Sequence, residues 1–156
     1  YGCYIGFKTF IDYGLKMPHP TGIVIGESAK IGKNCTIFQQ VTLGGARIGD
    51  GKQEKNPKVG DNVVIFAGAK LIGDITIGSN VVIAAGAVVT KNIPDGVVVG
   101  GNPAKIIETI ENFEKKYIKY NMGCKFLSHD QKLDFLKKQP EELFIKVVGV
   151  MSFKDK

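Results

Sequence analysis

Branched aliphatic residues recur every six positions along most of this chain. A first run occupies Ile25, Ile31, Ile37 and Leu43, and a second run occupies Val59, Ile65, Leu71, Ile77, Ile83 and Val89. Two positions before most of these lies another small or apolar residue: Ala29, Cys35, Val41, Val63, Ala69, Ile75, Val81 and Ala87. Because residues two apart on a strand face the same way, each unit sends two side chains inward. A single unit cannot bury its own inner face, so the pattern predicts an all-β solenoid, a parallel β-helix.

His19 breaks this count. It stands six residues before Ile25, in a slot that the count assigns to an inward aliphatic side chain, and it lies between Pro18 and Pro20. Exceptions to a consistent local rule mark functional sites. We therefore expect His19 to belong to a functional site, whereas His129, the other histidine, lies in a predicted helix cap and has a structural interpretation.

The repeat is interrupted between Leu43 and Val59, where the spacing is sixteen residues. We expect residues 44–58 to leave the coil as a loop, and loops on a regular scaffold tend to carry function. The predicted organisation is a lead-in and first coil at 1–22, the β-helix with this loop at 23–104, and a helical extension at 105–156.

Two helices are predicted in the extension. Apolar residues at helical spacing indicate an amphipathic helix from about 105 to 120. Ser128, followed three residues later by Gln131, forms a capping box that opens a second helix through Leu136.

Composition narrows the class of protein. The chain has 156 residues, 44% of them apolar, with 20 glycines and no tryptophan, as in a domain of short strands and tight turns. The net charge of +6 lies largely in the tail, mixed with acidic residues, and no stacking-aromatic motif indicates nucleic acid. Three dispersed cysteines argue against a disulfide framework. The same cysteine usage leads us to expect a cytoplasmic protein. We expect no membrane span, since no apolar run reaches about 18 residues.

Three stretches carry a resemblance to a known family: "HPTGIVIGESAKIGKNCTIFQQVTLGG" from His19, "NPKVGDNVVIFAGAKLIGDITIGSNVVIAAGAVVTKNIP" from Asn56, and "GNPAKII" from Gly101. They resemble the serine acetyltransferase branch of the hexapeptide-repeat acyltransferases. The resemblance implies a left-handed β-helix with three hexads per triangular coil, a homotrimer, and acetyl-CoA as cosubstrate without a metal. It also implies that His19 is the general base that deprotonates an acceptor hydroxyl. An imidazole, with an ordinary pKa of about 6.5, suits that role at neutral pH.

The same resemblance implies where acetyl-CoA binds. Small residues let the pantetheine arm approach the backbone, and basic residues meet the phosphates. The implied cofactor-binding residues are Ala67, Gly68, Ala85, Gly86, Thr90, Lys91 and Lys105.

The sequence departs from the family where the acceptor would bind. Relatives that acetylate serine carry an aspartate at the position of Tyr4, "DH" at Pro18-His19 and "RHPK" at residues 55–58. Charged partners for an amino acid are therefore largely missing, which weakens serine recognition. With these departures the coil resembles the polysaccharide and sugar O-acetyltransferases, which implies a sugar or glycan hydroxyl as the acceptor, with serine O-acetylation as the alternative. Candidate substrate-binding residues are Asn56, Gln39 and Gln40.

Other mechanisms and classes fit the sequence less well. A covalent route through Cys35 needs a reactive thiol, but Cys35 occupies an inward slot. A zinc β-helix needs three histidine ligands, and the chain has two histidines. A non-catalytic scaffold, the remaining class, needs no histidine in an aliphatic slot.

Overall fold

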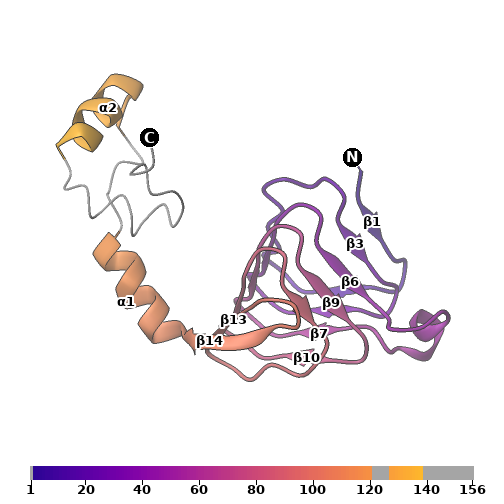
Figure 1. The fold of residues 1–156 in the computed structure, drawn as a ribbon. Coiled ribbons are helices and arrows are strands. Elements are labelled where there is room, and N and C mark those ends of the chain that lie inside the picture. Colours follow the sequence, from indigo (N-terminus) through magenta and orange to yellow (C-terminus); the bar gives the residue numbers. More distant parts are fainter. Residues whose placement is uncertain (1, 121–126, 139–156) are drawn as a thin grey trace, which may run out of the picture. The chain divides into compact units, whose positions relative to one another are not determined.

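The structure, a computed structural model, describes residues 2–120 and 127–138. The chain divides into two units, Tyr1–Phe113 and Glu114–Lys156. In the first unit the chain winds through three sheets in turn, so that each coil adds one short strand to each sheet (Figure 1). This is the parallel β-helix that the six-residue period predicts.

Three sheets, A, B and C, form the sides of the coil. All their strand pairs are parallel except β13 with β14. Sheet A contains β1 (Tyr4–Ile5), β3 (Val24–Ile25), β6 (Thr42–Gly44), β9 (Lys70–Ile72) and β12 (Val88–Val89). Sheet B contains β2 (Phe10–Ile11), β4 (Lys30–Ile31), β7 (Lys58–Val59) and β10 (Thr76–Ile77). Sheet C contains β5 (Thr36–Ile37), β8 (Val64–Ile65), β11 (Val82–Ile83), β13 (Val97–Gly100) and β14 (Lys105–Thr109).

The core consists of the slots that the period identified. All ten aliphatic slots from Ile25 to Val89 are buried, and so are the eight small or apolar residues that precede them by two positions. Register explains this burial, because Ile25, Leu43, Leu71 and Val89 stack in one column of sheet A. Each buried side chain therefore packs between equivalents in the coils on either side.

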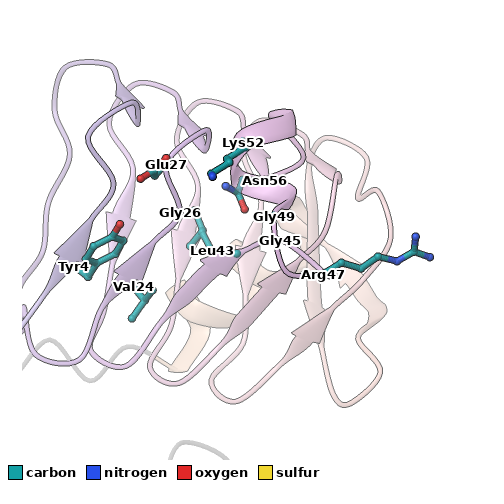
Figure 2. Close-up of a pocket in the computed structure, with 11 residues that line it drawn as sticks. Tyr4, Val24, Gly26, Glu27, Leu43, Gly45, Arg47, Gly49, Lys52 and Asn56 are labelled. Atoms are coloured by element: carbon teal, nitrogen blue, oxygen red, sulfur yellow. The ribbon is translucent and has the colours of Figure 1, made fainter.

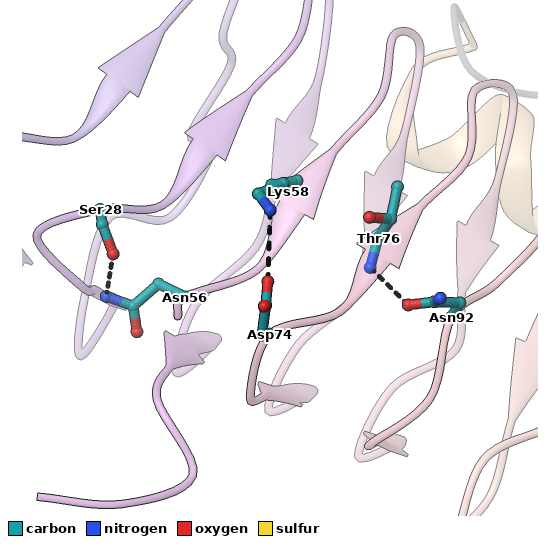
Figure 3. A network of polar contacts seen from close by, with 6 residues as sticks. All are labelled: Ser28, Asn56, Lys58, Asp74, Thr76 and Asn92. Carbon is teal, nitrogen blue, oxygen red and sulfur yellow. Dashed lines mark hydrogen bonds and ion pairs between the residues drawn. The ribbon is translucent and has the colours of Figure 1, made fainter. Parts of the chain in front are cut away.

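Backbone and side-chain hydrogen bonds join successive coils at the turns. Thr76 N donates to Asn92 Oδ1 over 2.9 Å, and Lys58 Nζ lies 3.2 Å from Asp74 Oδ1 (Figure 3). The exposed Lys58–Asp74 pair contributes little to stability. The spacing between coils is therefore set chiefly by the parallel ladders and by the turns, which stack closely.

Gly60 illustrates how closely the turns stack. A Cβ atom at this position would lie 2.7 Å from Ser79 Oγ and 2.8 Å from the Gly78 carbonyl carbon, and the latter belongs to the backbone. We expect Gly60→Ala to lower the free energy of unfolding by about 1–3 kcal/mol, because the coils must separate. Urea denaturation followed by circular dichroism measures this loss. Gly44→Ala is the control, since its Cβ would have only an ordinary contact, at 3.6 Å; an equal loss in both variants would contradict the explanation.

The predicted helix at 105–120 begins later than expected. Residues Lys105–Thr109 form β14, which pairs antiparallel with β13, and α1 is Ile110–Tyr120. The apolar residues at helical spacing include Ile106 and Ile107, β-branched residues that also suit a strand. Hydrogen bonds to the free edge of β13 favour the strand over the helix for residues 105–109. The spacing of apolar residues along the sequence carries no information about that edge.

The second predicted helix is confirmed as α2 (His129–Lys137). Ser128 N donates to Gln131 Oε1 over 2.9 Å, and Gln131 N donates to Ser128 Oγ over 3.3 Å, which is the reciprocal capping box. The parts of the predicted extension at 121–126 and 139–156 lie outside the described residues. In the described part of the chain, no helix is both long and apolar enough to cross a membrane.

Candidate functional site

His19 does not occupy a core slot, contrary to the count of sixes. Its side chain is exposed. A bridge between Lys16 and Thr36 places Met17 in register with Ile37, and Met17 packs against the core. Met17 therefore fills the slot, and the eight-residue step from Met17 to Ile25 leaves room for a turn that carries the histidine. The two additional residues turn an apparent core position into a solvent-facing one.

Aromatic rings lie beside the exposed histidine. The His19 ring centroid is 6.3 Å from that of Phe38, and Phe38 stacks on Phe66 at 5.1 Å. Within residues 2–120 and 127–138, Phe38 is the only side-chain partner of the imidazole. Thr21 N donates to the His19 carbonyl oxygen over 2.8 Å, which closes the turn. The imidazole is thus free to meet a substrate while its backbone is held.

Six predicted binding residues gather at the same corner. We call the turns at 18–22, 38–41, 66–69 and 84–87, which join sheet C to sheet A, the His19 corner. Hydrogen bonds of 2.9 Å connect its levels, from Gln40 N to the Thr21 carbonyl, from Gly68 N to the Gln39 carbonyl and from Gly86 N to the Ala67 carbonyl. The predicted residues at this corner besides His19 are Gln39, Gln40, Ala67, Gly68, Ala85 and Gly86.

The two glutamines at this corner differ in accessibility. Gln40 is exposed, whereas Gln39 Oε1 is buried and, among the described residues, has no hydrogen-bond partner. A bound molecule approaching from solvent therefore meets the Gln40 side chain first.

Asn56 lies at a different corner. We call the turns at 26–29, 45–57, 73–75 and 90–92, which join sheet A to sheet B, the loop corner. The predicted loop is present there and contains η1 (Asp50–Gln53). Asp50 is buried, and its Oδ2 accepts a hydrogen bond of 2.7 Å from Arg47 N. This contact gives the loop a defined shape.

Asn56 anchors the end of this loop. Its side chain is 2% exposed, and Nδ2 donates to Ser28 Oγ over 3.0 Å (Figure 3). A Cβ atom at Gly26 would lie 2.7 Å from Asn56 Nδ2, so the glycine makes room for the amide. The Asn56 amide therefore holds the end of the loop against the turn at 26–29, and its side chain also borders a pocket.

We expect Asn56→Ala to lower the free energy of unfolding by about 1–3 kcal/mol, because Ser28 loses its buried donor and a void remains. Thermal denaturation of the purified protein measures the change. Asn112→Ala is the matched control, since Asn112 is exposed on α1 and alanine favours a helix. Equal stability of the wild type and Asn56→Ala would show that the loop is held by other contacts.

The pocket at the loop corner has a volume of about 340 Å³. Tyr4 and Val24 lie on the strands of sheet A, while Glu27, Lys52 and Asn56 gather toward the loop end (Figure 2). Further lining residues are Gly26, Leu43, Gly44, Gly45, Arg47 and Gly49. The pocket combines an exposed aromatic ring with charges of both signs.

Sequence reasoning did not assign binding roles to Tyr4, Glu27 or Lys52. Tyr4 drew attention only as a departure from the family pattern. The only sequence feature that points to a binding role for Lys52 is its place in the predicted loop. Glu27 reaches the pocket because β3 pairs with β6 beside the loop, which is a non-local contact.

A second, smaller pocket of about 160 Å³ brings together the remaining predicted residues, Thr90, Lys91 and Lys105. Its other lining residues are Val89, Ile93, Pro103 and Ala104. Two lysines at one apolar pocket form a suitable site for an anionic group such as a phosphate.

Cys35 is buried among the core residues, and its thiol donates to the Gly60 carbonyl over 3.2 Å. Burial raises the pKa of the Cys35 thiol, with a smaller rise from the charge of Asp61, against a hydrogen bond with the Val63 backbone that lowers it. A buried, protonated thiol is a poor nucleophile. Across the described ranges, no group of three or more histidine, cysteine, aspartate or glutamate side chains is arranged to hold a metal ion.

Comparisons with known proteins agree with the repeat. Residues 56–91 match the bacterial transferase hexapeptide family of six repeats. A serine acetyltransferase of Staphylococcus xylosus is 46% identical over 107 residues, which are 69% of this chain and 46% of that protein.

The chain is also similar to solved structures of serine acetyltransferases. The crystal structure of a Neisseria gonorrhoeae serine acetyltransferase has a TM-score of 0.64 at 43% identity, covering 69% of this chain and 41% of that one. A serine acetyltransferase in complex with CoA has a TM-score of 0.58 at 38% identity, covering 64% and 40%. The chain thus spans less than half the length of these proteins. The matches confirm the left-handed parallel β-helix of hexapeptide repeats.

Proposed function

Since the chain belongs to the bacterial hexapeptide-repeat transferases, in their serine acetyltransferase-like branch, we propose that it is an acetyl-CoA-dependent O-acetyltransferase. The observation that carries the proposal is the exposed His19 at a corner of small residues, in a chain that is 46% identical to a serine acetyltransferase over 107 residues. A purely structural role does not explain an exposed imidazole at the His19 corner.

In the proposed reaction, a ring nitrogen of His19 takes the proton of the acceptor hydroxyl as the oxygen attacks the thioester carbonyl carbon. The carbon–sulfur bond of the tetrahedral intermediate then breaks, and the imidazolium returns its proton to the departing CoA thiolate. The products are an acetyl ester and CoA, and the histidine ends neutral. A base of this kind contributes about 10²–10⁴-fold to the rate.

The acyl donor is proposed to lie along the His19 corner. Gly68 and Gly86 carry no side chains, so the amides of a pantetheine arm can approach the backbone there. Thr90, Lys91 and Lys105, in the smaller pocket, would receive a phosphate of CoA. A neighbour solved in complex with CoA supports a CoA site in this fold.

A homotrimer is proposed to complete the acceptor site. His19 precedes β3 at one corner, whereas the pocket with Asn56 lies at the next corner of the same chain. In one chain the base and this pocket are therefore separated by the width of sheet A. A neighbouring copy could bring its loop corner to the His19 corner, so that each site contains residues of two chains.

L-Serine is the first candidate acceptor. The relatives and solved structures with which the chain aligns are serine acetyltransferases, and they support serine better than the sugar acceptor expected from the sequence. A sugar hydroxyl stays as the second candidate on one observation. Tyr4 stands where the family has an aspartate, and it is 54% exposed at the pocket. Its aromatic face suits a sugar ring, whereas the ammonium group of an amino acid would have no carboxylate partner at this position.

The test is CoA release from acetyl-CoA by the purified protein, with L-serine, sugars and nucleotide-sugars as separate acceptors. Release with serine alone would support the first candidate, and release with a sugar alone would support the second. Binding of acetyl-CoA without acyl transfer to any acceptor would contradict the proposed function.

A further inference from the structure

Gln40 has a left-handed backbone conformation, and the equivalent positions in the other coils at the His19 corner are all glycine. The equivalent residues in the other coils, Gly22, Gly68 and Gly86, have φ angles of 66°, 73° and 68°, and Gln40 has 59°. Each of these residues donates its N–H to the coil before it, so the four positions form one column. A side chain in this left-handed region is strained, and strain of this kind is typical of functional sites.

The other positive-φ residues of the coil do not share this feature. At the corner between sheets B and C, the equivalent positions are Asn34, Asn62 and Asn80, and asparagine tolerates the left-handed region. Glu54, in the loop at 45–57, also has a positive φ of 55°; among the described residues outside this loop, Gln40 is the only one at positive φ that is neither glycine nor asparagine. Local turn geometry alone gives no reason for a glutamine here.

The Gln40 side chain leans toward the turn of His19. A Cβ atom at Gly22 would lie 3.4 Å from Gln40 Cγ, and at Gly68 the nearest atom to such a Cβ is Gly86 N, 3.9 Å away, because Gly86 has no side chain. Gly86 is exposed, with no described atom within 4 Å of a Cβ built there, whereas Gln40 places a side chain beside Gly22. The Lys70 ammonium donates to the Gln40 carbonyl oxygen and helps to hold the turn.

We propose that Gln40 closes the end of the acyl-donor track and limits the acyl group to acetyl. This inference rests on the proposed function, in which the donor runs over Gly86 and Gly68 toward His19. Adjacent coils are about 4.8 Å apart, so a donor that follows the glycines meets the Gln40 side chain one coil beyond Gly68. An acetyl group ends before this side chain, whereas two further methylenes would run into it.

The test compares the binding of acetyl-CoA and butyryl-CoA, measured by calorimetry without an acceptor. We expect the wild type to bind acetyl-CoA at least about tenfold more tightly, the range for methylene discrimination in a closed pocket. Gln40→Gly makes the glycine column continuous and should bring the two affinities to within about twofold of each other. Gln40→Asn, which keeps an amide on a shorter side chain, should give an intermediate ratio.

Fold integrity is controlled in the same experiment. Gln40→Gly removes backbone strain, so its melting temperature should equal or exceed that of the wild type. Asn34→Gly makes the same kind of backbone change at another corner and should keep the wild-type preference for acetyl-CoA.

Three results would overturn the proposal: equal affinities in the wild type, an unchanged ratio in Gln40→Gly, or no binding of either acyl-CoA to the wild type. Failure of the proposed function is distinguishable from these. If the expected ratios are found but no acceptor is acetylated, the acyl-length limit stands and the transferase proposal fails.

Discussion

Replacing His19 by alanine will lower kcat/KM for acyl transfer by about 10²–10⁴-fold, the contribution expected of a positioned general base. The acceptor hydroxyl holds its proton tightly, and without the imidazole only water can remove it. CoA release, followed with a thiol reagent at saturating acetyl-CoA, measures the loss. The affinity for CoA should change little, because the proposed donor contacts lie on other coils.

The variant will stay folded, since the His19 side chain is exposed and its one recorded aromatic pair among the described residues is with Phe38. His129→Ala is the control for loss of a histidine as such, because His129 begins α2 in a part of the chain outside the β-helix. Near-normal turnover by His19→Ala, in the acceptor assay that works for the wild type, would remove His19 from the base role.

Replacing Leu71 by alanine will lower the free energy of unfolding by about 2–5 kcal/mol, the range for a large-to-small change in a close-packed core. Leu71 is 0% exposed and stacks between Leu43 and Val89 in the column of sheet A. The regular ladders on both sides prevent the coil from collapsing into the void. Because a solenoid transmits stability between neighbouring coils, the loss affects more than one repeat.

Urea denaturation followed by circular dichroism measures this effect, and Ile48→Ala is its matched control. Ile48 is a fully exposed aliphatic residue at the loop, so its truncation should change stability by no more than about 0.5 kcal/mol. Equal losses in the two variants would mean that burial in the column does not govern stability.

The position of the proposed base shows where counting along the sequence stops being sufficient. Spacing of six assigns His19 to the core, but the actual step across this turn is eight, from Met17 to Ile25. The count cannot tell which of two candidate residues fills a slot, because both are compatible with the local pattern. Pairing of Lys16 with Thr36, twenty residues along the chain, makes that choice.

The candidate site was predictable in its parts but not in its arrangement. The resemblance to the family implied Gly68 and Gly86 as binding residues, and the structure places both at the His19 corner, whereas their binding role stays a prediction. Separation of Asn56 from His19 depends on which sheets their turns join, and this follows only from the stacking of complete coils. The pocket residues Tyr4 and Glu27 meet the loop for the same reason.

The sequence by itself determined the β-helix, its inward residues and its loop, because a six-residue period is local and repeats its information in every coil. Tertiary structure alone decided that residues 105–109 are a strand, that His19 faces solvent and that Gln40 takes a left-handed conformation. Each of these depends on hydrogen bonds or packing between residues in different coils. Such contacts exist only once the register of the coils is set, and no window of sequence contains them.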